Sequence, residues 1–122
     1  MLADSRTGVA AAAAVANERI VVPGHFDVEV YGTFRRLFRQ RRLTRGRFDA
    51  VVVRLARLAA ERVGLSGLLL EAHAIADRVS ATDAFYIALA RARDVELLTT
   101  DAHLARGAGR LARIRLIASV ES

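Results

Sequence analysis

The chain has 122 residues, a formal net charge of +6 and no cysteine, and 53% of its residues are hydrophobic. This length predicts one domain spanning residues 1–122, and the lack of cysteine excludes disulfides and thiolate zinc sites. The longest apolar run, Val9 to Ala16, is far shorter than the roughly 20 residues that cross a bilayer, so no membrane span is expected. The start of the chain also lacks the pattern of a secretion signal, which predicts a cytoplasmic protein.

All nineteen basic side chains other than histidine are arginines, and the sequence pI is about 11.3. Guanidinium groups bind phosphates in a bidentate way and stack on unpaired bases, so the bias suits contact with RNA. A GC-rich genome or an acidic protein partner would explain the same bias. Composition alone therefore leaves these alternatives open.

The first half of the chain predicts three helices and one strand. An alanine-rich helix is expected from Thr7 to about Glu18, with Asp4, Ser5 or Thr7 as its cap. A short strand, Arg19 to Val22, leads through Pro23 and Gly24 into a helix from about Phe26 to Arg42. A further helix, capped by Thr44, is expected to end near Ala60.

The second half continues the alternation of strands and helices. The expected elements are a strand Glu61 to Leu65, a helix Ser66 to about Val79, a helix Asp83 to about Arg93, a strand Val95 to Thr99, a helix Ala102 to about Arg106 and a strand Arg113 to Ala118. Alternation of this kind predicts an α/β fold of three layers, with a parallel sheet flanked by helices.

Three acidic residues occupy equivalent places in this scheme. Glu29 lies in the first turn of the helix that follows the first strand, Asp83 begins its helix, and Asp101 comes where the strand Val95 to Thr99 ends. Carboxyl ends of parallel strands meet at one edge of a sheet, so these side chains are expected to converge. Each acid by itself also fits a helix cap.

Carboxylates held close together repel one another unless a cation lies among them. A set of oxygen ligands without cysteine or paired histidines favours Mg²⁺ or Mn²⁺ over zinc. Such an ion activates water for attack on a phosphodiester, so hydrolysis of a nucleic acid is the expected chemistry. Asp27, His25, His73 and His103 are interpreted as caps, turn residues or residues at helix margins.

The sequences around the three acids resemble a known family. Residues 27–37, DVEVYGTFRRL, residues 80–90, SATDAFYIALA, and residues 97–105, LLTTDAHLA, resemble the segments that hold the second, third and fourth acidic residues of VapC-type PIN domains. The spacings of fifty-four residues from Glu29 to Asp83 and eighteen from Asp83 to Asp101 are also typical of that family.

This resemblance implies a Mg²⁺- or Mn²⁺-dependent endoribonuclease, the toxin of a toxin-antitoxin pair. Such toxins are usually homodimers inhibited by a VapB antitoxin. By position, Glu29, Asp83 and Asp101 correspond to metal-binding catalytic acids, and the hydroxyl of Thr100 is expected to support the site. Transfer, ribosomal and messenger RNA all fit as substrates.

The sequence departs from the family at its start. VapC-type PIN domains open with a hydrophobic strand that ends in an aspartate, and that strand is central to their sheet. No such strand precedes the alanine-rich stretch here, and Asp4 lies only twenty-five residues before Glu29. Either the native chain begins further upstream, or the protein is a shortened relative with weak activity or none.

Two further functions compete with the nuclease. One is a non-catalytic module that keeps the fold and binds an antitoxin or RNA without cleavage. The other is a DNA-binding protein that uses the arginines from Arg35 to Arg47, although no recognition helix with base-reading side chains stands out. The same arginines also fit a solvated face or a surface that binds the antitoxin.

Overall fold

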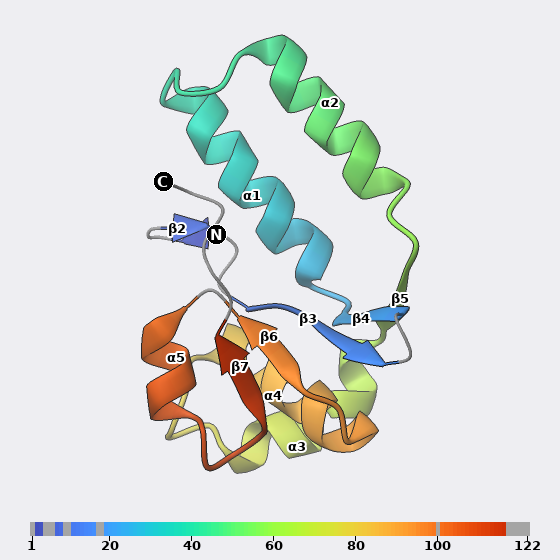
Figure 1. The fold of residues 1–122 in the computed structure, drawn as a ribbon, viewed down its shortest axis with the longest axis vertical. Coiled ribbons are helices and arrows are strands. Elements are labelled where there is room, and N and C mark those ends of the chain that lie inside the picture. The colour runs from blue at the N-terminus through green and yellow to red at the C-terminus, as the bar shows by residue number, and fades with distance from the viewer. Residues whose placement is uncertain (1, 4–6, 9–10, 17–18, 100, 117–122) are drawn as a thin grey trace.

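The computed structural model describes residues 2–3, 7–8, 11–16, 19–99 and 101–116, which form an α/β fold (Figure 1). The strands are β1 (Leu2–Ala3), β2 (Thr7–Gly8), β3 (Ala11–Ala16), β4 (Arg19–Pro23), β5 (Ala60–Val63), β6 (Leu97–Thr99) and β7 (Ile114–Leu116). The helices are α1 (Phe26–Arg39), α2 (Arg45–Ala56), the 3₁₀ turn η1 (Leu65–Leu68), α3 (Leu69–Ala74), α4 (Ala81–Arg93) and α5 (Ala102–Gly107). The expected α/β class is therefore confirmed.

Five strands form the main sheet, in the order β5-β4-β3-β6-β7. The pairs β4 with β5 and β6 with β7 are parallel, as expected. The central strand, β3, runs antiparallel to both of its neighbours, β4 and β6. Because β4 and β6 both oppose β3, they point the same way, and their carboxyl ends lie at the same edge of the sheet.

The helix predicted from Thr7 to Glu18 was wrong, because residues Ala11–Ala16 of this segment form strand β3. An isolated alanine-rich helix of about twelve residues is only marginally stable in water. As a strand, the same backbone pairs on both sides and joins β4 to β6, which would otherwise leave two unpaired edges. The proposed cap Asp4 lies outside the described residues.

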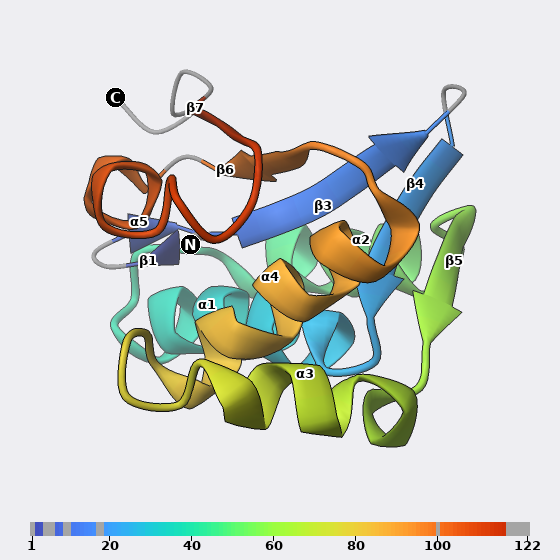
Figure 2. The same ribbon diagram turned by 90° about the horizontal axis from the view of Figure 1, so that it is seen from below.

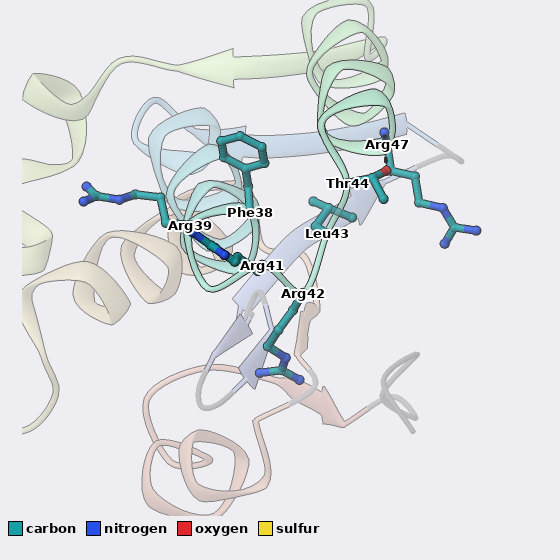
Figure 3. A pocket seen from close by; sticks show the side chains of 7 residues that line it. All are labelled: Phe38, Arg39, Arg41, Arg42, Leu43, Thr44 and Arg47. Carbon is teal, nitrogen blue, oxygen red and sulfur yellow. Dashed lines mark hydrogen bonds between the residues drawn. The ribbon is translucent and has the colours of Figure 1, made fainter.

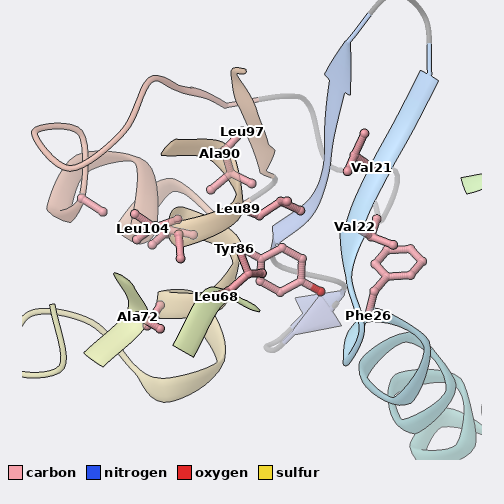
Figure 4. Close-up of a cluster of buried hydrophobic side chains, with 14 of the residues drawn as sticks. Val21, Val22, Phe26, Leu68, Ala72, Tyr86, Leu89, Ala90, Leu97 and Leu104 are labelled. Atoms are coloured by element: carbon pink, nitrogen blue, oxygen red, sulfur yellow. The ribbon is translucent and has the colours of Figure 1, made fainter. Parts of the chain in front are cut away.

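Helix α4 is central to the fold, since it packs against the sheet on one side and against α3 on the other (Figure 2). Six of its residues are buried: Ala84, Tyr86, Ile87, Ala88, Leu89 and Ala90. They pack with Val21 and Val22 of β4 and with Leu97 of β6 to form the main core (Figure 4). The buried face of α4, from Ala84 onward, therefore fixes this helix against the sheet.

Helices α1 and α2 form an antiparallel hairpin that extends away from the sheet (Figure 1). The rings of Phe38 and Phe48 stack with centroids 5.1 Å apart, and the Tyr31 ring lies 5.6 Å from that of Phe48. Thr44 caps α2 as expected, since its hydroxyl accepts a hydrogen bond from the Arg47 amide. The aromatic contacts therefore join the two helices near the tip of the hairpin.

The remaining differences from the predictions concern where elements end. Helix α1 ends at Arg39 and α2 at Ala56, both earlier than predicted. The single helix predicted from Ser66 to Val79 was wrong, because this segment is divided between η1 and α3 and turns after Ala74. Helix ends depend on caps and tertiary contacts, which periodicity does not report. No helix among the described residues has the length and hydropathy needed to span a membrane.

Candidate active site

The three acidic residues singled out in the sequence lie at the starts of three helices. Glu29 is in the first turn of α1, which follows β4. Asp83 is in the first turn of α4, and Asp101 is the N-cap of α5, which follows β6. Since β4 and β6 end at the same edge of the sheet, the topology places Glu29 and Asp101 at that edge. Thr100, the predicted supporting residue, lies outside the described residues.

Asp83 and Asp101 line one cleft, with a volume of about 480 Å³. Ser80 and His103 also contribute to its wall. The position of Asp83 follows from the cap of α4, in which the Ser80 hydroxyl accepts a hydrogen bond from the Asp83 amide at 3.2 Å. Two carboxylates from segments eighteen residues apart therefore face the same cavity.

Glu29 does not line this cleft but lies in a hydrogen-bonded group beside it. The buried Tyr86 hydroxyl donates a hydrogen bond to Oε1 of Glu29 at 2.5 Å. Nε2 of His25 lies 3.7 Å from the same oxygen and 3.1 Å from the Thr82 carbonyl oxygen. The His25 ring packs against that of Tyr86, with centroids 4.9 Å apart. Glu29 is thus tied to α4, the helix that carries Asp83.

The carboxylate of Asp83 interacts electrostatically with those of Glu29 and Asp101. Burial raises the pKa of Asp83 above its usual value, and the negative charge of Asp101 raises it further. Burial also raises the pKa of Glu29, where the charge of Asp83 adds to the effect and the Tyr86 hydrogen bond opposes it. Burial raises the pKa of Tyr86 as well, so its hydroxyl stays protonated and remains a donor. Asp83 therefore interacts with both other acids.

Asp101 has a structural role in addition to its place in the cleft. Its Oδ1 accepts hydrogen bonds from the amides of His103 at 2.9 Å and Leu104 at 3.2 Å. Its own amide donates to Oγ1 of the buried Thr99 at 3.0 Å. The expectation that each acid fits a helix cap therefore holds for Asp101, while Oδ2 has no hydrogen bond among the described residues.

The donor set matches a hard divalent cation in chemistry, because carboxylate oxygens are the ligands that Mg²⁺ and Mn²⁺ prefer. The raised pKa values of Glu29 and Asp83 are what carboxylates show when they share a region of low dielectric without a counter-ion. Within the described residues, however, no three acidic or histidine side chains stand close enough together to hold an ion. A site that uses all three acids stays a prediction.

The other polar residues weighed in the sequence lie outside this group or at its margin. Asp27 forms a bidentate pair with Arg62, at 2.6 Å and 2.9 Å. His73 is exposed on α3, while His103 is exposed at the cleft wall.

Sequence reasoning missed the roles of His25 and Tyr86. His25 is the N-cap of α1 and not merely a turn residue. Helical spacing offered a signal for both, because His25 precedes Glu29 by four residues and Tyr86 follows Asp83 by three. Side chains at these spacings share one helix face.

Comparison with known proteins adds an independent line of evidence. A family model described as "PIN domain" matches residues 1–110. The chain is 39% identical to Ribonuclease VapC3 of Mycobacterium tuberculosis (strain H37Rv) over 94 residues, which cover 77% of this chain and 69% of the relative. It is 32% identical to Ribonuclease VapC12 of the same strain over 111 residues, which cover 91% of this chain and 86% of the relative.

Proposed function

Because the chain belongs to the PIN domain family and is related to the VapC ribonucleases, we propose that it is a metal-dependent endoribonuclease and the toxin of a toxin-antitoxin pair. The observation that carries this proposal is the place of Asp83. Its carboxylate faces a cleft together with Asp101 and interacts electrostatically with Glu29 on the other side. Clustered carboxylates with raised pKa values are typical of functional sites.

Asp83, Asp101 and Glu29 are the residues that would hold Mg²⁺ or Mn²⁺ in this proposal. Such an ion supplies, when bound, an activated water and stabilisation of negative charge on the leaving oxygen. The raised pKa values of Glu29 and Asp83 support this assignment, since a cation would offset the cost of burying their charges and the smaller repulsion between the acids.

The other side chains of the site would position these acids. Tyr86 fixes Oε1 of Glu29 through its hydroxyl, and His25 connects α1 to the Thr82 carbonyl. Ser80 fixes the first turn of α4 through the Asp83 amide. Positioning of this kind is the main contribution a protein makes to phosphodiester hydrolysis by a metal.

The resemblance to VapC-type toxins extends the proposal to partners. We expect the protein to be a homodimer that a VapB-type antitoxin inhibits. We expect the toxin and the antitoxin to act in the cytoplasm, with RNA as the substrate of the toxin. Co-expression with a VapB-type antitoxin tests this: growth arrest by the protein alone and rescue by the pair are expected. Equal growth with and without the antitoxin would contradict the toxin role.

A non-catalytic module that binds an antitoxin or RNA is the second candidate. One observation favours it, namely that the described part of the chain contains no group of three side chains at metal-binding distance. This module would keep the fold and its affinity for partners, and it would lack hydrolysis.

A cleavage assay separates the two candidates. Structured RNA is incubated with the protein and Mg²⁺ or Mn²⁺, with excess EDTA, or with the Asp83→Asn variant. The nuclease proposal expects divalent-dependent cleavage that this substitution reduces at least about a hundredfold. Equal cleavage by the two proteins removes Asp83 from catalysis, and no cleavage by either supports the non-catalytic module.

A further inference from the structure

The tip of the α1–α2 hairpin carries a concentrated positive charge. Between Val30 and Phe48 the sequence has seven arginines and no acidic residue. These arginines, which we call the tip arginines, are Arg35, Arg36, Arg39, Arg41, Arg42, Arg45 and Arg47. All seven are exposed. The tip therefore holds more than a third of the chain's arginines on one small part of its surface.

Most of this charge is not neutralised within the protein. Arg45 pairs with Asp49, with Nε 3.1 Å from Oδ1, and its guanidinium lies 5.7 Å from the centre of the Phe38 ring. The other six tip arginines make no ion pair with any residue that the structure describes. Several arginines elsewhere, such as Arg62 and Arg93, do have acidic partners. Unpaired guanidiniums at this density attract a polyanion.

The tip is hollowed as well as charged. A pocket of about 740 Å³ is lined by Phe38, Leu43, Thr44 and four arginines (Figure 3). The side chains of Arg39, Arg42 and Arg47 extend in different directions around it (Figure 3). Guanidiniums that spread apart in this way match successive phosphates along a strand better than a single small anion.

One of these arginines occupies a backbone position that normally favours glycine. Arg41 has φ of 60°, in the left-handed region. It follows the C-cap Gln40 in a Schellman arrangement, in which the Arg41 amide donates to the Phe38 carbonyl and the Arg42 amide to the Leu37 carbonyl. Glycine adopts this conformation without steric cost, so folding alone does not explain an arginine here.

We propose that the tip arginines form a docking surface for the phosphate backbone of single-stranded RNA, away from the cleft that contains Asp83. This inference rests on the proposed function for the identity of the polyanion. Ten residues of α1 separate Glu29 from Arg39, a distance of about 15 Å at ~1.5 Å per residue. A stacked strand covers this distance in about four or five nucleotides, at ~3.4 Å each. The surface would hold RNA at that distance from the cleaved bond.

The surroundings of the tip favour RNA over an acidic peptide. Tyr31 is 42% exposed and continues the ring contacts of Phe48 and Phe38, so a base has an aromatic face on which to stack. Among the described residues, no exposed large aliphatic side chain lies between Arg35 and Arg47. The apolar side chains of the pocket, Phe38 and Leu43, are only partly exposed, so a peptide partner would find few prominent apolar anchor points at the tip.

Binding of a labelled oligouridine of roughly twelve nucleotides tests the surface directly. Fluorescence anisotropy in excess EDTA separates binding from cleavage. The variants are Arg41→Gly, which relieves the left-handed backbone, and Arg42→Gln. Arg57→Gln is the matched control, because it removes the same charge from the exposed far end of α2. Melting of each variant is followed by circular dichroism.

We expect Arg41→Gly to melt at the same temperature as the parent or higher, and yet to bind RNA about fivefold more weakly. Each tip variant should also lower the slope of log affinity against log salt by about 0.7, the value for one phosphate contact on a single strand. Arg57→Gln should change neither quantity. Unchanged affinity in the double variant Arg41→Gly, Arg42→Gln, or an equal loss in Arg57→Gln, would overturn the proposal.

A polyglutamate of the same length is the competing ligand, and displacement of RNA by an equal concentration of it would identify the surface as an acidic-peptide site instead. Failure of the nuclease proposal has a different signature. A protein that never cleaves RNA but binds it through the tip retains this inference. A protein that cleaves RNA normally in the double variant, with unchanged KM, loses only this inference.

Discussion

Replacement of Tyr86 by phenylalanine tests the hydrogen bond that supports Glu29. Tyr86 is only 1% exposed, so phenylalanine should keep the packing of the core while it removes the donor to Oε1. A hydrogen bond to a charged group contributes about 1.5–3 kcal/mol. The Glu29 side chain is 34% exposed, so water partly replaces the lost donor and the low end applies. We expect a loss of about 1.5 kcal/mol in the free energy of unfolding near neutral pH.

The pH dependence of this loss has a definite sign. The pKa of Glu29 is raised above its ordinary value of 4.5 in the folded protein, mainly by burial. Its contribution to stability is therefore fully present below pH 4.5 and is lost as pH rises through the raised pKa. The Tyr86 hydrogen bond lowers the pKa of Glu29, so removing the hydroxyl raises that pKa further. The difference between the two proteins should be small in acid and largest above both pKa values.

Thermal unfolding followed by circular dichroism measures this effect, in EDTA at about pH 4 and about pH 7.5. Near neutral pH the melting temperature should fall by about 6 °C, at ~4 °C per kcal/mol for a domain of this size. Tyr31→Phe is the matched control, because the exposed Tyr31 hydroxyl has no hydrogen bond among the described residues. An equal loss in both variants, or a Tyr86→Phe loss that is the same at both pH values, would refute the reasoning.

The remaining predictions concern the caps and charges of the cleft. Ser80→Ala and Thr44→Ala each remove a helix N-cap, so each should lower the free energy of unfolding in urea by about 1 kcal/mol. Only Ser80→Ala should also slow RNA cleavage, because it loosens the first turn of α4, which carries Asp83. Equal cleavage by the two variants would show that the cap does not position Asp83. Asp101→Asn should keep the α5 cap and change the free energy of unfolding by less than about 0.5 kcal/mol, while RNA cleavage is lost. Asp101→Ala should lose both the cap and the cleavage. Retained cleavage in the asparagine variant would show that the site does not need the Asp101 charge. In EDTA, Asp83→Asn should raise the melting temperature, because it removes a partly buried charge and its repulsion by Asp101. Without EDTA, the same substitution should abolish the stabilisation that Mg²⁺ or Mn²⁺ gives the parent, and a variant that Mg²⁺ still stabilises would place the ion elsewhere.

The cleft also shows why a pattern of acids in the sequence has more than one interpretation. Asp101 serves as the N-cap of α5 and lines the cleft through the same short side chain. A helix N-terminus stabilises a carboxylate by the same dipole that attracts other anions, so capping and function are compatible at one residue. Asp101→Asn separates the two roles because an amide oxygen can still accept the backbone hydrogen bonds.

The sequence by itself determined those elements that local chemistry specifies. The strand that begins at Arg19, the cap Thr44 and the acids at three helix starts all follow from short-range patterns, whereas the cap Ser80 and the start of α4 at Ala81 were not predicted. The sequences around Glu29, Asp83 and Asp101 also carried the family resemblance, which the match to the PIN domain model confirms.

Only the tertiary structure decided the state of the alanine-rich segment and the partners of Glu29. Alanine favours a helix locally, yet Ala11–Ala16 pairs as the central strand, because β4 and β6 both have edges that only this segment covers. Tyr86 reaches Glu29 across fifty-seven residues, since burial of α4 against the sheet turns its hydroxyl toward α1. Contacts of this kind depend on how elements pack, and the energy of packing outweighs local propensity.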